Sequence, residues 1–326
     1  MNADVLITTA FLHPGDEVDR SLRAAGLTTR HEPQLDRLDD ADRQHALAAT
    51  RAIIAGTRPL TAADIGAAAD LQIIVRTGVG YDSVDVAAAS ERGIPVCVTA
   101  GANRQAVAEH VFTLMLAAAR RVPDSIRNLD AGTWQQPTGR ELRGATLGIL
   151  GLGSIGKAVA LIAAGFGMTV IAYDPYFDAA FAEQQGIRRV TLDELLIDAD
   201  FVSLHLFLDD STRGLIGAEK LAMMKNDAIL INTARGGIVD EVALVDAVRE
   251  GVIGGAALDV FAVEPLPKDS PLLRTPGIVA TTHVAGATRE ARSESGRMAA
   301  ANVIGVLTGA DAPQHVVNPG HAVVPA

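Results

Sequence analysis

The sequence predicts an α/β protein with two parallel-sheet domains and a cleft between them. A chain of 326 residues favours two domains over one and is long enough to bury a real core. Short apolar runs alternate with helix-like segments in two separate series. Strands that alternate with helices predict parallel sheets covered on both faces. Long helices flank the second series, and we expect them to join the two domains.

The first series occupies roughly the first third of the chain. Its apolar runs, expected as buried strands, are residues 5–7, 52–54, 72–75 and 94–98. A longer helix is expected over residues 103–121, because apolar residues recur there at helical spacing. Pro123 is expected to stop this helix, since proline cannot continue one.

The second series begins near residue 145. Its expected strands are residues 146–150, 169–173, 201–206, 228–231, 255–260 and 278–280, and a last helix is expected over residues 287–307. That helix would carry the chain back to the first unit. We therefore expect one domain over residues 1–100, completed by 290–326, and a second over 101–289. Ligands of such folds lie beyond the carboxyl ends of the strands, here in the cleft.

Composition and net charge exclude several classes of binding partner. The net charge of −11 argues against nucleic acid, whose binding depends on Lys and Arg neutralising phosphates. Cys97 is the only cysteine, so an internal disulfide or a cysteine metal cluster is excluded, and we expect no metal. The start of the chain does not resemble a signal peptide, and no stretch predicts a membrane span. These features predict a cytoplasmic protein with neither nucleic acid nor membrane as partner.

A glycine-rich loop predicts a dinucleotide site. The strand at 146–150 runs directly into Gly151-Leu152-Gly153-Ser154-Ile155-Gly156, and a helix follows. This is the strand, loop and helix context that the pattern requires, with the pyrophosphate on the helix N-terminus. Asp174 ends the next strand, about twenty residues further on, where a carboxylate accepts hydrogen bonds from a ribose 2′-OH. The segment after it has no Arg or Lys to hold a 2′-phosphate, so NAD is favoured over NADP.

Three polar residues follow later strands. Arg235 lies after the strand at 228–231, Glu264 after the strand at 255–260, and His283 after the strand at 278–280. An arginine holds a carboxylate in a fixed orientation, a histidine exchanges a proton with a carbonyl oxygen, and a glutamate orients the histidine. These residue types fit hydride chemistry on a carbonyl beside a carboxylate. Spacing alone leaves open a structural His283 and a surface Glu264.

Six motifs together resemble the D-isomer-specific 2-hydroxyacid dehydrogenases, in the phosphoglycerate dehydrogenase-like branch, over nearly the whole chain. They are VRTGVGYD at 75–82, AVAEH at 106–110, GLGSIG at 151–156, INTARGG at 231–237, ALDVFAVEP at 257–265 and TTHVAGAT at 281–288. The resemblance implies two Rossmann-like or flavodoxin-like domains, a homodimer formed through helices of the nucleotide domain, and catalysis by Arg235, Glu264 and His283.

The resemblance also implies binding residues. For the substrate these are Arg76, Thr77, Gly78 and Val79, together with Arg235. For the cofactor they are the glycine loop, Asp174 and a further set consisting of Val107, His205, Thr233, Ala234, Asp259, His283 and Ala285. Alternatives stay open for three of them, since Arg76 could pair with a nearby acid, His205 could be a satisfied strand-end histidine, and Asp259 could simply end a strand. His110 is expected in the core.

Several positions depart from the branch. Residues 54–57 lack the Arg-Ser pair that assists phosphate binding, with Arg58 displaced, and no basic residue directly follows Trp134. A phosphate dianion without cations is poorly held, which disfavours 3-phosphoglycerate. Phe207, Ala100 and Thr282 stand where prolines are common.

The sequence therefore predicts an NAD-dependent oxidoreductase for a small anionic substrate, a 2-oxo acid and (R)-2-hydroxy acid pair, with His283 as acid/base and Arg235 as anion clamp. An alternative is an NAD-dependent phosphite or phosphonate oxidoreductase on the same scaffold. A third interpretation, from another class, is a dinucleotide-sensing regulatory protein.

Overall fold

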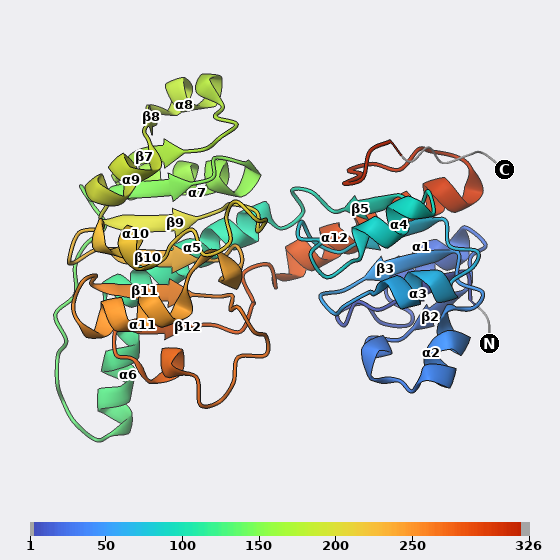
Figure 1. Ribbon diagram of the computed structural model, residues 1–326, viewed down its shortest axis with the longest axis horizontal. Helices are drawn as coiled ribbons and strands as arrows, with labels where there is room; N and C mark the ends of the chain where they lie inside the picture. The colour runs from blue at the N-terminus through green and yellow to red at the C-terminus, as the bar shows by residue number, and fades with distance from the viewer. Residues whose placement is uncertain (1–2, 321–326) are drawn as a thin grey trace. The chain divides into compact units, whose positions relative to one another are not determined.

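The computed structural model describes residues 3–320, and the chain divides into two α/β units. Unit 1 consists of Met1–Asn103 with Thr288–Ala326, and unit 2 of Arg104–Ala287. Each unit contains one sheet in which all paired strands are parallel, five strands in unit 1 and seven in unit 2 (Figure 1). The predicted α/β class with two parallel sheets is confirmed.

Unit 1 has the strand order β2-β1-β3-β4-β5. Its strands are β1 (Val5–Ile7), β2 (Thr29–His31), β3 (Ala52–Ala55), β4 (Ile73–Arg76) and β5 (Val96–Val98). Its α-helices are α1 (Glu17–Ala24), α2 (Asp40–Leu47), α3 (Ala62–Ala67), α4 (Val86–Glu91) and α12 (Arg289–Thr308).

Side chains that alternate along β1 show how both faces of this sheet are packed. Val5 and Ile7 pack in one apolar cluster with Val303 of α12, whereas Leu6 between them packs in a second cluster with Leu47 of α2. Successive side chains of a strand point to opposite faces, so a continuous apolar run supplies both faces with core residues. The strand is fully buried as a result.

Unit 2 has the strand order β12-β11-β10-β9-β6-β7-β8. Its strands are β6 (Thr146–Leu150), β7 (Thr169–Tyr173), β8 (Arg188–Arg189), β9 (Phe201–Leu204), β10 (Ile229–Asn232), β11 (Gly255–Leu258) and β12 (Ile278–Ala280). Its α-helices are α5 (Arg104–Ala119), α6 (Val122–Asp130), α7 (Ser154–Gly165), α8 (Ala179–Gln185), α9 (Leu192–Asp198), α10 (Ala218–Ala222) and α11 (Glu241–Arg249). The order reverses between β6 and β9, where ligands of such sheets bind.

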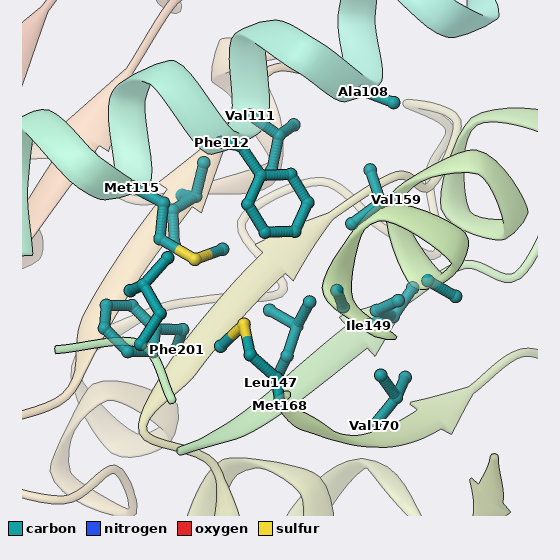
Figure 2. Close-up of a cluster of buried hydrophobic side chains, with 14 of the residues drawn as sticks. Ala108, Val111, Phe112, Met115, Leu147, Ile149, Val159, Met168, Val170 and Phe201 are labelled. Atoms are coloured by element: carbon teal, nitrogen blue, oxygen red, sulfur yellow. The ribbon is translucent and has the colours of Figure 1, made fainter. Parts of the chain in front are cut away.

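One face of this sheet is closed by α5 and α7. Figure 2 shows Val111 and Met115 of α5 beside Leu147 and Ile149 of β6, with Phe201 of β9 in the same cluster. These side chains are fully buried, so the core fixes the backbone from which the loops at the strand ends emerge. The opposite face packs a second cluster that includes Leu195 of α9 and Leu244 of α11.

The structure differs from the expected elements in several places. The helix expected over 103–121 ends at Ala119, Arg121 adopts the left-handed conformation, and Pro123 lies in the first turn of α6 instead of ending a helix. A first-turn proline removes no helical hydrogen bond. Two edge strands, β2 and β8, were not expected. Strands β9 and β11 end two residues earlier than expected, so His205 and Asp259 directly follow them. Across residues 3–320, no helix is both long and apolar enough to cross a bilayer.

Candidate active site

The polar residues of interest in unit 2 gather at one edge of its sheet. Parallel strands share the edge at which their carboxyl ends lie, and neighbouring strands there are β6, β9, β10, β11 and β12. The residues that follow these strands are Gly151, His205, Thr233, Asp259 and Thr281. The sheet order thus brings together segments that are far apart in the sequence.

The glycine loop lies against its own backbone. Gly151 has a φ of +98°, and a Cβ added to it would lie 2.7 Å from the His205 carbonyl oxygen. A Cβ on Gly156 would clash with the Gly151 carbonyl oxygen. Gly153 has open space beside it and caps α7 without a side-chain hydrogen bond. The first turn of α7 therefore offers backbone N–H groups beside open space, which is the arrangement that binds a pyrophosphate.

Asp174 follows β7 and is bound to the glycine loop. Its Oδ2 accepts a hydrogen bond from the Leu152 N–H at 2.6 Å, and its Oδ1 accepts one from the Tyr176 N–H at 2.6 Å. A carboxylate has about four acceptor positions, so each oxygen keeps capacity for another donor. The structure thus places Asp174 beside the loop, and its contact with a ribose stays a prediction.

Two further predicted cofactor residues lie at the ends of β9 and β10. The Thr233 hydroxyl oxygen is buried and has no hydrogen-bond partner among residues 3–320. A buried polar atom of this kind needs an explanation, and a ligand group is one. His205 Nε2 lies 2.9 Å from the Ser203 hydroxyl, and burial lowers the pKa of His205 to about 3. His205 is therefore neutral near pH 7.

Arg235 leaves β10 through a turn that Asn232 supports. The Asn232 amide Nδ2 donates to the Arg235 carbonyl at 2.9 Å, and its Oδ1 accepts from the Ala234 N–H at 3.0 Å. The Arg235 Nη1 donates to the Ala234 carbonyl at 2.7 Å. Gly236 follows, and any Cβ there would clash with the Phe261 backbone. Only glycine allows the loop after β10 to approach the loop after β11 this closely.

That second loop carries Glu264, which is hydrogen-bonded to His283. His283 Nδ1 lies 2.7 Å from Glu264 Oε2, and Glu264 Oε1 accepts from the Phe261 N–H at 3.0 Å. Both side chains of the pair are partly exposed, 37% for His283 and 36% for Glu264. The imidazole is therefore supported on one side and can be reached on the other.

The charge on Glu264 determines which nitrogen of His283 carries the shared proton. Burial opposes ionisation of Glu264, but the hydrogen bonds from His283 and the Phe261 N–H and the charge of Arg235 keep its pKa below the usual 4.5. An ionised carboxylate only accepts, so Nδ1 of His283 donates to it. Nε2 is then the ring nitrogen that Glu264 leaves free of its hydrogen bond.

Of the remaining predicted cofactor residues, Val107, Asp259 and Ala285 are buried in unit 2 and Ala234 is half-buried. Asp259 receives the Ala285 N–H at 2.8 Å, and Val107 lies in α5. Phe207, after β9, is exposed.

The predicted substrate residues of unit 1 lie at the end of β4, where Arg76 is the last residue of the strand, and just beyond it. Arg76 and Thr77 are buried, and the Thr77 hydroxyl donates to the Ala55 carbonyl at 3.1 Å. The Arg76 Nη1 donates to the Thr77 carbonyl at 2.7 Å. Gly78 has a φ of +150°, and its N–H donates to the Arg76 carbonyl at 2.9 Å, while Val79 is half-buried. Their contact with a substrate stays a prediction.

Two residues that support the site were not singled out from the sequence. Asn232 braces the Arg235 turn, and Glu241 Oε1 accepts from the Ala262 N–H at 2.7 Å, which holds the Glu264 loop. An amide at the end of a buried strand was a usable signal for Asn232. Glu241 gave no signal, because its position in the first turn of α11 already suits an acidic residue.

Comparison with known proteins adds a family. Residues 112–285 match the family described as D-isomer specific 2-hydroxyacid dehydrogenase, NAD binding domain. A D-3-phosphoglycerate dehydrogenase of Methanocaldococcus jannaschii is 42% identical over 306 residues, which cover 93% of this chain and 56% of that protein. A glyoxylate reductase of Korarchaeum cryptofilum is 43% identical over 268 residues, 80% of each protein. The chain thus spans little more than half of the first relative and most of the second.

The fold has close counterparts among solved structures. The TT0316 protein of Thermus thermophilus superposes with a TM-score of 0.85 at 36% sequence identity, over 96% of this chain and 99% of that one. The likeness therefore extends over both units.

Proposed function

The chain belongs to the D-isomer specific 2-hydroxyacid dehydrogenase family, and from this premise we propose that it is an NAD-dependent oxidoreductase that interconverts a 2-oxo acid and its (R)-2-hydroxy acid. The observation that carries the proposal is the pair His283–Glu264, with Nδ1 and Oε2 at 2.7 Å, next to Arg235 at the carboxyl edge of a sheet with a glycine-rich loop. A supported histidine beside a guanidinium is what reduction of a 2-oxo acid requires.

Each residue has a distinct task in the proposed reduction. The Arg235 guanidinium binds the substrate carboxylate and fixes the direction of the adjoining carbonyl. His283 Nε2 donates a proton to the carbonyl oxygen, and in the reverse reaction it removes that proton from the alcohol. Glu264 keeps the other proton on Nδ1 and stabilises the imidazolium through its negative charge.

The residues present fit NAD. A bound dinucleotide would use three features: the first turn of α7, which no side chain caps, the open space beside Gly153, and the Thr233 hydroxyl, which has no hydrogen-bond partner among residues 3–320. When bound, NAD supplies or accepts the hydride at the substrate carbon. Its pyrophosphate would be held by the glycine loop, that is by Gly151, Gly153, Ser154, Ile155 and Gly156. Its ribose would be held by Asp174. The remaining parts of the NAD molecule would be surrounded by Val107, His205, Thr233, Ala234, Asp259, His283 and Ala285.

We assign the two units different tasks. The match of residues 112–285 to an NAD-binding domain supports the cofactor role for the segment 101–289. Residues 1–100, completed by 290–326, would then bind substrate through Arg76, Thr77, Gly78 and Val79. Arg58 is engaged with Asp36, which supports a substrate without a phosphate group, such as glyoxylate or hydroxypyruvate.

A second copy of the chain is the proposed partner. Helix α6 buries none of its residues, and Ile126 and Leu129 on it are exposed, as is Trp134 beyond it. An apolar surface of this kind marks an interaction site, and it lies in the unit through which we expect a homodimer. Sedimentation of the purified chain and of Ile126→Asp tests this. A monomer at micromolar concentration would rule the homodimer out.

The reaction is tested with a panel of oxyanions followed at the nicotinamide absorbance. With NADH, we expect turnover of at least one of glyoxylate, hydroxypyruvate, pyruvate and phenylpyruvate, and an (R)-hydroxy acid product. With NAD, phosphite and short phosphonates test the alternative oxidoreductase. Turnover of phosphite with none of the 2-oxo acids would replace the proposal. Binding of NADH without turnover of any substrate would favour a dinucleotide-sensing regulator.

A further inference from the structure

A buried polar cluster lies behind the His283 loop, and the roles proposed above do not use all of it. Its members are His110 of α5, Asp259 after β11 and Thr281 after β12. Asp259 is completely buried, and the His110 side chain is 16% exposed. Burying a carboxylate, an imidazole and a hydroxyl has a cost unless they are paired. These three bind one another.

Asp259 holds the loop that carries His283. Its Oδ1 accepts the Thr281 hydroxyl at 2.6 Å and the Val284 N–H at 2.9 Å, and its Oδ2 accepts the Ala285 N–H at 2.8 Å. Its backbone carbonyl accepts the His283 N–H at 2.9 Å. One residue thus receives donors from four of the five positions between 281 and 285. Burial opposes ionisation of this carboxyl, but the bonds from His110, Thr281 and the two loop amides keep its pKa below the usual 3.8.

The loop needs this support because His283 has an unusual backbone. Its φ is +54°, in the left-handed region that side chains other than glycine rarely adopt. Such a conformation persists only where the surrounding structure fixes it. The bonds to Asp259 come from His283 itself and from the two residues after it, so they fix the peptide planes on both sides of this strained position. The direction of the imidazole toward Glu264 follows from that backbone.

His110 completes the cluster through Thr281. A hydroxyl has one proton, and Thr281 gives it to Asp259, so the Thr281 oxygen accepts from His110 Nε2, which lies 3.0 Å away. The same Nε2 lies 3.5 Å from Asp259 Oδ1. The imidazole therefore carries its proton on Nε2 and sets the direction in which the Thr281 hydroxyl points.

We propose that His110 is a positioning residue for proton transfer: through Thr281 and Asp259 it holds the loop from which His283 reaches the substrate. The proposal rests on the proposed function, because His110 acts through His283. It assigns a task in the reaction to a residue of α5 through its contacts with Thr281 and Asp259.

The test compares three variants. His110→Leu removes the donor and keeps apolar bulk, whereas His110→Gln keeps an N–H near the position of Nε2. Thr113→Val is the matched control. It removes a hydroxyl one turn further along the same helix, and that hydroxyl donates to the Glu109 carbonyl of the helix itself. We measure kcat and KM with NADH and the best 2-oxo acid of the panel, thermal stability, and amide hydrogen exchange of the protein without cofactor.

For His110→Leu we expect kcat to fall roughly tenfold to a hundredfold, as a small misplacement of a reacting group does, with little change in KM for NADH. His110→Gln should recover most of the loss. Amide exchange at Val284 and Ala285 should be faster in His110→Leu without cofactor, and unchanged in Thr113→Val. Thr281→Val should reproduce the loss without adding to that of His110→Leu, and it replaces His110→Leu if that variant does not fold.

Two results would overturn the proposal. One is a His110→Leu enzyme with normal kcat and normal exchange at Val284 and Ala285. The other is a loss of kcat that only parallels a loss of folded protein and that His110→Gln does not recover. Absence of turnover in every variant and in the unchanged protein would instead contradict the proposed function, and the exchange rates would still decide whether His110 holds the loop.

Discussion

Both sheets carry polar residues at the carboxyl ends of their strands, but these side chains differ between the two units in exposed fraction and in bonding partners. At the end of β4 of unit 1, Arg76 and Thr77 are 7% and 8% exposed and bond to nearby backbone carbonyls. In unit 2, beyond β11 and β12, Glu264 and His283 are each more than a third exposed while bonded to each other. The two unit 1 side chains are buried and bond to backbone, whereas the unit 2 pair is supported and still accessible to a ligand.

This comparison separates effects on turnover from effects on stability. Changes at the accessible residues of unit 2 should lower turnover and leave the fold intact. Changes at the buried acids of unit 1 should lower the free energy of unfolding and leave the kinetics of the remaining folded protein intact.

The largest effect is expected for His283→Ala. Loss of the proton donor should lower kcat on the order of a hundredfold to ten-thousandfold, because water replaces an oriented imidazole. Steady-state kinetics with the best 2-oxo acid of the panel measures this, and tight NADH binding should remain. His45→Ala, an exposed histidine of α2 in unit 1, is the control. Near-native turnover of His283→Ala would exclude His283 as the proton donor.

A smaller effect is expected for Arg235→Gln. Hydrogen bonds to a charged group contribute about 1.5–3 kcal/mol, so kcat/KM should fall roughly tenfold to more than a hundredfold for any carboxylate substrate. Lysine keeps the charge but lacks the planar pair of donors, so Arg235→Lys should recover part of the loss. The exposed Arg249→Gln in α11 controls for a change of net charge in the same unit. An unchanged kcat/KM in Arg235→Gln would remove Arg235 from substrate binding.

The residues that could be predicted from the sequence are those whose signal is local. The glycine loop and Asp174 occur at a fixed spacing within one strand-helix-strand segment, and the structure joins them through the Leu152 N–H. The buried strands were predictable because runs such as residues 52–54 are continuously apolar. Strands β2 and β8 were not, since they lie at sheet edges and consist of Thr-Arg-His and Arg-Arg, without an apolar pattern.

The spacing of residues along the chain does not show which loops meet across the sheet. Glu264 and His283 lie in loops after different strands, and their contact depends on the order of β11 and β12 in the sheet. His110 and Thr281 are 171 residues apart, and the apolar spacing of α5 hid the polar contact of His110. The left-handed backbone of His283 has no signature in the sequence either, because it arises from the bonds to Asp259.

For Asp174→Ala we expect a moderate effect on cofactor affinity and on the preference between NADH and NADPH. The variant removes the charge that repels a 2′-phosphate and the acceptor of the Leu152 and Tyr176 N–H groups. We expect NADH affinity to fall about tenfold, the cost of one hydrogen bond, and the ratio of NADPH to NADH turnover to rise. Asp174→Asn keeps an acceptor without the charge, so it should keep more of the loop geometry. An unchanged cofactor ratio in both variants would show that Asp174 does not face the ribose.

The smallest effect on turnover is expected in unit 1, for Asp64→Asn. Asp64 is buried, receives the Thr61 N–H and hydroxyl at 2.8 Å each, and pairs with Arg43. Burial opposes its ionisation, but these partners keep its pKa below the usual 3.8. A depressed pKa stabilises the fold fully above 3.8, and this stabilisation is lost as the pH falls through the folded-state value. Breaking such a buried pair costs about 3 kcal/mol. Denaturant unfolding at pH 7 should therefore show a large loss for Asp64→Asn.

The pH dependence of stability distinguishes the loss of the Asp64 carboxylate from a general folding defect. Between pH 7 and pH 3 the unchanged protein should lose more stability than Asp64→Asn, because the variant has no carboxylate to protonate at this position. The half-buried pair of Arg58 and Asp36 supplies the control, since Asp36→Asn should cost at most about 1 kcal/mol. At temperatures where Asp64→Asn stays folded, its kcat should equal that of the unchanged protein. A reduced kcat there would mean that the buried acids of unit 1 also affect catalysis, and the division between the two units would fail.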